Sequence, residues 1–177
     1  MVAEARALPD DKPSFEQLYR GLLQRIYAYV RSQVGNAADA EDVTAQVFIK
    51  AYQAYPRYES RRATPDAWVF QIARNAIADH HRRRARQERL AAAVAGAGQP
   101  EQDPAQMAEG RMLQAQLWAA VMKLGRRQRE AVALRHLGLS FAEVGSVLQC
   151  SEDAAKMLCH RALKALRHHL GEESDGA

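Results

Sequence analysis

Basic side chains gather between residues 74 and 89, in the stretch RNAIADHHRRRARQER, where six arginines stand against only Asp79 and Glu88. The aromatic residues that precede this stretch are Tyr52, Tyr55, Tyr58, Trp68 and Phe70. Positive charge that holds phosphates, beside rings that stack on bases, is typical of a surface for single-stranded nucleic acid. The alternative is that the rings form a core. We expect Trp68 to be mostly packed and leave open whether Tyr58 is free.

A second basic surface is predicted near the C-terminus. Residues 140–148 and 151–170 indicate a short helix, a tight turn and a longer helix, which is the spacing of the helix-turn-helix in DNA-binding proteins. Ser140 with Glu143 forms a capping box at the start of the first helix, and Ser151 caps the second. The outer face of the second helix carries Lys156, His160, Arg161, Lys164 and Arg167. The alternative is a helical hairpin with a solvated basic face.

Single residues around this turn sharpen the prediction. Gly145 stands where the first helix must let the second come close, and Ala155 occupies an inward position of the second helix. Gln149 stands where such turns usually carry glycine, because the backbone there tends to be left-handed, at a cost of about 1 kcal/mol for other residues. Glu152 and Asp153 put negative charge where DNA would approach, although acids also suit a helix start.

An acidic group lies in the second predicted helix. Asp39, Glu41 and Asp42 fall within four residues, and Gln46 and Lys50 follow them. Acids at a helix start are ordinary, because they complement the helix dipole. A cluster of this kind is also suited to docking a basic partner, and the residues alone leave both interpretations open.

Nothing in the sequence indicates an enzyme. There is no glycine-rich phosphate loop and no arrangement of a nucleophile with a base, so we expect no catalytic residue and no cofactor. Asp79-His80-His81 resembles a metal-ligand motif, but two adjacent histidines on a helix cannot face one metal ion. Cys150 and Cys159 are not part of four ligands at zinc spacing, so we expect no metal site.

The composition is that of a globular chain. Its 177 residues are 47% hydrophobic and 26% charged, and the net charge of +4 permits a polyanion partner without requiring one. Two cysteines cannot make a disulfide framework and favour a reducing compartment. No apolar run reaches the roughly 18 residues of a membrane span, and the first residues lack the apolar core of a signal peptide. We therefore expect a cytoplasmic protein without membrane insertion.

The elements that must position these surfaces are all helices. Apolar residues recur every three or four positions, and capping residues, glycines and Pro56 separate the segments. Residues 1–13 predict a flexible tail, residues 87–107 a flexible linker with a helical first turn or two, and residues 172–177 an acidic tail. The sequence therefore predicts an all-α fold of two small helical domains, 14–86 and 108–171.

Three stretches together resemble a family. They read DAEDVTAQVFIKAYQAY, WVFQIARNAIADHHRRR and LGRRQREAVALRHLGLSFAEVGSVLQCSEDAAKMLCHRALKALR, and they are similar to the bacterial RNA polymerase sigma factors of the extracytoplasmic-function group. The resemblance covers roughly residues 14–86 and 108–170. It implies sigma domain 2, a helical bundle, followed by sigma domain 4, a helix-turn-helix. It also implies a dissociable transcription initiation subunit without catalysis, which brings core RNA polymerase to chosen promoters and helps to melt them.

The resemblance assigns roles to single residues. The helix that would dock on the clamp helices of the largest polymerase subunit contributes Asp39, Glu41, Asp42, Gln46 and Lys50. The loop 58–64, Asn75 and the arginines would hold the −10 element, through Tyr58, Asn75, Arg82, Arg83, Arg84 and Arg86. The −35 element would be read by Ser151, Lys156, His160 and Arg161. Met157 and Leu158 replace the family's commonest Ser-Arg, so no base contact is expected from position 158, and Leu158 and Cys159 are predicted to turn inward.

Two other functions stay open at this point. An autonomous helix-turn-helix regulator would leave the arginine stretch idle, and an RNA-binding adaptor would not explain the helix-turn-helix. The predicted partners are core RNA polymerase and promoter DNA, and an anti-sigma factor is left open. Two small DNA-facing units on a flexible linker have no fixed relative geometry, so we expect the free protein to bind promoter duplex weakly.

Overall fold

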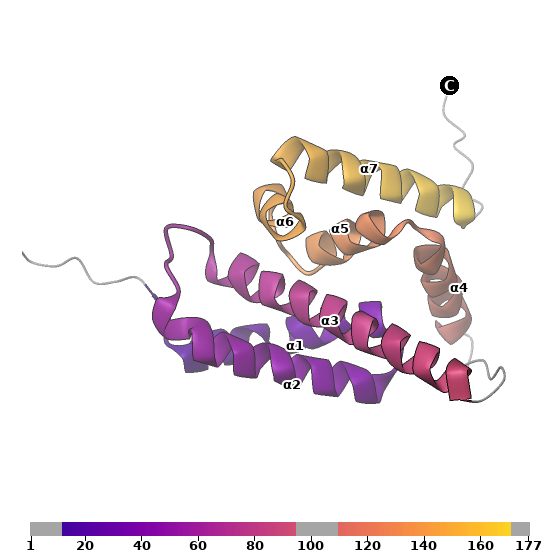
Figure 1. Cartoon of the computed structure of the whole chain (residues 1–177). Helices are drawn as coiled ribbons and strands as arrows, with labels where there is room; N and C mark the ends of the chain where they lie inside the picture. The colour runs from indigo at the N-terminus through magenta and orange to yellow at the C-terminus, as the bar shows by residue number, and fades with distance from the viewer. Residues whose placement is uncertain (1–11, 95–109, 171–177) are drawn as a thin grey trace, which may run out of the picture.

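The computed structural model describes residues 12–94 and 110–170, and every regular element in these ranges is a helix. The elements are α1 (Phe15–Val34), α2 (Ala37–Ala54), the short 3-10 helix η1 (Tyr55–Arg57), α3 (Pro65–Val94), α4 (Gly110–Lys123), α5 (Arg126–His136), α6 (Phe141–Leu148) and α7 (Glu152–His169). The predicted all-α fold is confirmed. We refer to α1–α3 as the N-terminal bundle and to α4–α7 as the C-terminal bundle (Figure 1).

The predicted capping residues define where the helices begin. Ser14 Oγ accepts a hydrogen bond from the Gln17 amide at 3.2 Å, and the Gln17 side chain accepts one from the Ser14 amide at 3.0 Å. Ser140 and Glu143 form the same reciprocal pair at the start of α6. These bonds satisfy amide groups that the first turn of a helix leaves without partners.

The helix-turn-helix has the geometry that its residues predict. A Cβ atom on Gly145 would lie 2.8 Å from the Cys150 carbonyl oxygen, so only glycine lets α6 approach the turn this closely. Gln149 has a φ of 54° and thus occupies the left-handed conformation that usually belongs to glycine. Ala155 is fully buried at the start of α7, against α6.

The third helix is longer than the predicted first domain. α3 continues from Pro65 to Val94, eight residues past the predicted boundary at 86. Leucine and three alanines favour a helix in the stretch that adds its last turns. The rest of the predicted linker, the two predicted tails except Lys12 and Pro13, and residues 108–109 and 171 lie outside the described residues.

The two bundles pack against each other, whereas the sequence predicted domains without a fixed relative geometry. α6 lies against α3, and α5 lies against α1 (Figure 1). One continuous apolar core joins them, with Ile26 and Phe70 on one side and Leu134 and Leu139 on the other, all fully buried. The sequence showed that each helix has an apolar face, but not that the two bundles share one core.

Helix α4 contributes least to this packing. Ala120 and Leu124 pack on Ala162 and Leu166 of α7 in a small separate cluster. Leu117 of α4 is 45% exposed beside the exposed Trp118. In the described part of the chain, no helix is long and apolar enough to span a bilayer.

Candidate nucleic-acid interface

Two of the arginines on the basic face of α3 are paired with acids. Arg82 forms an ion pair with Asp79, which Lys50 of α2 also approaches at 3.3 Å. Arg84 is 3.0 Å from Glu88 and 3.7 Å from Asp39 of α2. The hydrogen bond from Arg82 is the main reason why the pKa of Asp79 is lowered from its ordinary value. Two of the four predicted phosphate-binding arginines thus already have carboxylate partners.

Other residues of α3 that were predicted to contact the −10 element are exposed and free to bind nucleic acid. Arg83 and Arg86 are exposed and form no ion pair with any described residue, and Asn75 is also exposed. Because α3 is one continuous helix, Asn75 and the two arginines lie on a single rigid element. A nucleic acid that follows this helix would meet an amide first and free guanidinium groups further along.

Tyr58 is not available for stacking in this conformation. Its ring is only 7% exposed, with its centroid 4.8 Å from the Trp68 ring and 6.0 Å from the Tyr55 ring. Its hydroxyl donates to the Ala63 carbonyl oxygen at 2.7 Å, and burial raises its pKa. The open question about Tyr58 is therefore answered: the ring packs and shapes the loop 58–64. Trp68 is partly buried, as predicted.

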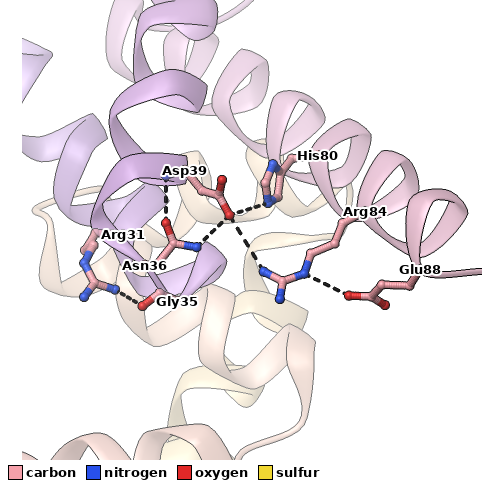
Figure 2. Close-up of polar contacts among 7 residues, drawn as sticks. All are labelled: Arg31, Gly35, Asn36, Asp39, His80, Arg84 and Glu88. Carbon is pink, nitrogen blue, oxygen red and sulfur yellow. Dashed lines mark hydrogen bonds and ion pairs between the residues drawn. The ribbon is translucent and has the colours of Figure 1, made fainter. Parts of the chain in front are cut away.

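Asp39 faces α3 rather than solvent, as Figure 2 shows. The Asp39 amide donates to Asn36 Oδ1 at 2.8 Å, and Asn36 Nδ2 donates to Asp39 Oδ2 at 2.6 Å. The same carboxylate oxygen is 3.5 Å from His80 Nε2 and 3.7 Å from Arg84. Asp39 therefore joins α2 to α3. Asp39 was predicted to bind polymerase, whereas its partner Arg84 was predicted to bind DNA.

The predicted docking residues divide between two faces of α2. Glu41 and Asp42 are exposed and lie in no ion pair among the described residues, while Gln46 is partly buried and Lys50 is paired with Asp79. Glu41 also lies at a groove of about 700 Å³ between α1 and α2. The apolar lining of this α1–α2 groove includes Phe15, Tyr19, Leu23, Tyr27, Phe48, Ile49 and Tyr52. Ile49 and Tyr52 are 56% and 66% exposed, and sequence analysis did not identify this groove.

On α7 the predicted basic residues face solvent. His160 and Arg161 are exposed and form no ion pair with described residues. Lys156 differs, because its ammonium is 3.0 Å from Glu152 and 3.5 Å from Asp153. The hydrogen bond to Glu152 is the main reason why the pKa of Lys156 is raised. Ser151 uses its hydroxyl as the helix cap, accepting from the Ala154 amide at 3.2 Å.

The inward face of α7 agrees with the prediction. Cys159 is 5% exposed, and Leu158 is partly buried against the shared core. Burial raises the pKa of the Cys159 thiol, as expected for a small core residue. Among the described residues, no group of histidine, cysteine and acidic side chains is arranged to hold a metal ion.

In the comparison with known proteins, each bundle matches a protein-family model. The family model described as Sigma-70 region 2 matches residues 18–87, and the model described as Sigma-70, region 4 matches residues 114–166. The ECF RNA polymerase sigma factor SigL of Mycobacterium tuberculosis is 33% identical over 152 residues, which are 83% of this chain and 83% of SigL. The chain belongs to the extracytoplasmic-function (ECF) sigma factor family.

Two further sigma factors are similar to this chain. BldN of Streptomyces coelicolor is 33% identical over 171 residues, and the match covers 96% of this chain but 65% of BldN. The solved sigma factor RpoE of Bartonella quintana, in complex with the anti-sigma factor NepR, has a TM-score of 0.72 at 24% identity. The alignment covers 90% of this chain and 98% of RpoE, so the two chains share a fold.

Sequence analysis missed the residues that join the bundles. Arg25 donates to the Leu137 carbonyl oxygen at 2.9 Å, and Arg74 is 3.3 Å from Glu130. A buried acid was the available signal: Glu130 lies on the apolar side of α5, between Ala131 and the arginines that precede it. Its partner is 56 residues away in the chain, so no local pattern could identify it.

Proposed function

We propose that this ECF sigma factor binds core RNA polymerase and directs it to promoters whose −10 and −35 elements are contacted by α3 and α7. The observation that carries the proposal is the presence of two basic helices, one on each bundle, both with unpaired cations at the surface. Arg83 and Arg86 supply them on α3, and Arg161 supplies one on the outer face of α7. The members of this family are not enzymes in the usual sense, and the role proposed here is recognition.

Core polymerase docks, in this proposal, on the exposed side of α2. Glu41 and Asp42 offer charge to a basic surface, and the adjacent α1–α2 groove offers exposed apolar area at Ile49 and Tyr52. An amphipathic helix with apolar and basic residues fits both features. Asp39 pairs with His80 and Arg84 of α3, and Lys50 pairs with Asp79 of α3, which supports a further role in which they hold α2 against α3. Their role is to position the docking face.

At the −10 element, Asn75 recognises an unstacked base and Arg83 and Arg86 hold the adjoining phosphates. The loop 58–64, held by the packed Tyr58 ring, leads directly into α3, the helix that carries Asn75. At the −35 element, α7 enters the major groove and Arg161 contacts a base edge or a phosphate. These events take place where the polymerase and the chromosome are, in the cytoplasm. An anti-sigma partner stays a prediction.

The test measures core binding and promoter-specific transcription together. We expect Glu41→Arg with Asp42→Arg to weaken binding to core polymerase at least tenfold while helicity is kept, because both acids are exposed and the helix loses at most about 1 kcal/mol of dipole stabilisation. The matched control, Glu41→Asp with Asp42→Glu, keeps the charge and is expected to bind as the unmodified chain does. Run-off transcription on a promoter library then reports whether the complex selects sequences.

The second candidate is an autonomous helix-turn-helix regulator, which the exposed basic face of α7 also suits. It predicts tight, sequence-specific gel shifts by the free protein as a dimer. If these are seen, and core polymerase adds neither affinity nor transcription, the sigma function is wrong for this chain.

A further inference from the structure

Lys12 lies before α1 in the sequence but contacts the chain beyond the end of α2. Its ammonium donates to the Tyr55 carbonyl oxygen at 2.6 Å and to the Tyr58 carbonyl oxygen at 3.4 Å. The same nitrogen is 4.1 Å from the centroid of the Tyr55 ring and 5.5 Å from that of the Tyr58 ring. One partly buried side chain thus holds both ends of η1, the turn that leads from α2 into the loop 58–64.

Neighbouring residues of the same segment also bind Tyr55. The Tyr55 hydroxyl donates to the Pro13 carbonyl oxygen. The Phe15 ring meets the Tyr55 ring edge to face, with the two centroids 5.5 Å apart. Tyr55 is therefore held through its carbonyl group, its ring and its hydroxyl by three residues that lie within four positions of the chain.

The end of α2 explains why a cation is favourable at this position. A helix carries partial negative charge at its C-terminus, where carbonyl groups lack amide partners within the helix. The last turn of α2 itself contains no basic residue. Lys12 therefore supplies, from another segment, the positive charge that this helix end lacks. The electron-rich face of the Tyr55 ring adds a second attraction for the ammonium.

The position of Tyr55 determines that of the loop 58–64 through packed rings. The Tyr55 and Tyr58 rings are stacked, with centroids 6.0 Å apart, and the Tyr58 ring lies 4.8 Å from the Trp68 ring of α3. The Tyr58 hydroxyl then donates to the Ala63 carbonyl oxygen near the other end of the loop. A displacement of Tyr55 would therefore shift the start of the loop and, through Tyr58, its end.

We propose that Lys12 is a positioning residue for recognition of the −10 element. Its ammonium fixes the loop 58–64 in the conformation that guides DNA to α3, and Lys12 contacts no DNA itself. This inference rests on the proposed function, in which the loop leads into the helix that carries Asn75. In the described conformation the ammonium is occupied by two carbonyl oxygens and a ring face, whereas a phosphate contact requires a free cation.

Loss of this contact has a different expected effect on DNA than on polymerase. Without the ammonium the loop adopts more conformations, so only a fraction of the molecules present it correctly, and base capture weakens by that fraction. Core binding is expected to stay, because Glu41 and Asp42 lie near the start of α2, about 20 Å along the helix from Tyr55. A separation of these two effects is what distinguishes positioning from a general loss of folded protein.

The experiment compares Lys12 variants of the full-length chain, alone and with core polymerase. In the free protein, Lys12→Ala is expected to speed hydrogen exchange of the Tyr58 and Arg62 amides at least threefold, because their hydrogen bonds lie in η1 and in the loop. With core polymerase and promoter DNA, it is expected to lower the permanganate reactivity of the opened −10 region about three- to tenfold at unchanged core affinity. Lys12→Arg keeps the cation and is expected to restore both values, whereas Lys12→Gln keeps a donor without charge and is expected to restore little. The matched control is Arg20→Ala, which removes an exposed cation from α1 and is expected to change neither value.

Three outcomes would overturn the positioning role of Lys12. The first is that Lys12→Ala leaves hydrogen exchange in the loop unchanged. The second is that it lowers core affinity and promoter opening together, as a loss of folded protein would. The third is that it lowers the slope of log affinity against log salt by about one, because the ammonium then binds a phosphate. If no form of the chain binds core polymerase, the proposed function fails, while hydrogen exchange of the free protein still decides whether Lys12 holds the loop.

Discussion

The two basic helices differ in how their cations are held. On α3, Arg82 and Arg84 are paired with Asp79, Asp39 and Glu88, so they must exchange a carboxylate for a phosphate before they hold DNA. On α7, Arg161 faces solvent without an ion pair among the described residues. A free cation contributes its full counterion release to DNA binding, and a paired one contributes less. The position of an arginine in a basic stretch therefore does not determine its contribution.

The largest effect is expected from Arg161, an unpaired arginine on the outer face of α7. Arg161→Ala is expected to weaken −35 binding in the polymerase complex by about 1–3 kcal/mol and to relax the preference at one base if the guanidinium reads a base edge. Lys156→Ala is expected to cost less and to act evenly across sequences, because Glu152 and Asp153 hold its ammonium. Selection of −35 variants against each protein separates the two patterns. If neither variant alters the selected sequences or the salt dependence, α7 is oriented differently on DNA.

A core position on the same helix provides the control for this prediction. Leu158 is partly buried against the shared core, so Leu158→Ala is expected to lower the melting temperature, with a loss of about 1–2 kcal/mol of stability. In the same selection of −35 variants, the base preference of the Leu158→Ala protein is expected to stay unchanged.

The features of α7 and its turn were predictable because they are local. The caps at Ser140 and Ser151, the close approach at Gly145 and the left-handed Gln149 each depend on a few neighbouring residues, and the structure has them all. A period of three to four residues likewise separated Cys159, which is buried, from Lys156, which is exposed. Exposure of the recognition face follows from such patterns alone.

The features of α3 were not predictable in the same way. Asp39 and Arg84 are 45 positions apart, and the packing of Tyr58 depends on rings from Tyr55 and Trp68 on both sides of a loop. Which acid neutralises which arginine depends on how α2 lies on α3, and this is set by tertiary packing. The contact between the bundles was not predictable for the same reason. The apolar face of a helix does not indicate which other surface it packs against.

The paired and unpaired arginines of α3 are expected to contribute differently to DNA binding. Replacing the unpaired Arg83 and Arg86 by alanine is expected to lower the slope of log affinity against log salt for −10 DNA by about 1.8, one phosphate for each arginine. Replacing the paired Arg82 and Arg84 is expected to lower it by less, because their carboxylate partners already neutralise them. The measurement is a salt titration of complex formation on promoter DNA. Equal slopes for the two double variants would show that the ion pairs of α3 do not persist on DNA.

The smallest expected effect concerns Glu143, the residue of α6 that joins the two regions. Burial alone would raise the pKa of this carboxyl, but hydrogen bonds from the Thr64 hydroxyl and from Ser140 outweigh it and lower the pKa below the ordinary 4.5. A carboxylate with a depressed native pKa stabilises the folded form at pH values above its unfolded pKa. That contribution is lost as the pH falls through the native value. Between pH 7 and pH 5 we therefore expect no change from this group, and a loss only below about pH 4.5.

Glu143→Gln isolates this contribution, because glutamine still completes a capping box and can accept from the Thr64 hydroxyl, but does not titrate. We expect the unmodified chain to melt at a slightly higher temperature than this variant at pH 7, and the difference to shrink as the pH falls below about 4.5. The radius of gyration is expected to follow the same course, since the Glu143 carboxylate holds the loop 58–64 against the helix-turn-helix through the Thr64 hydroxyl. A difference in melting temperature that shrinks without any change in the radius of gyration would assign Glu143 to the α6 cap alone. The contact between the bundles would then depend on Glu130 and on the apolar core.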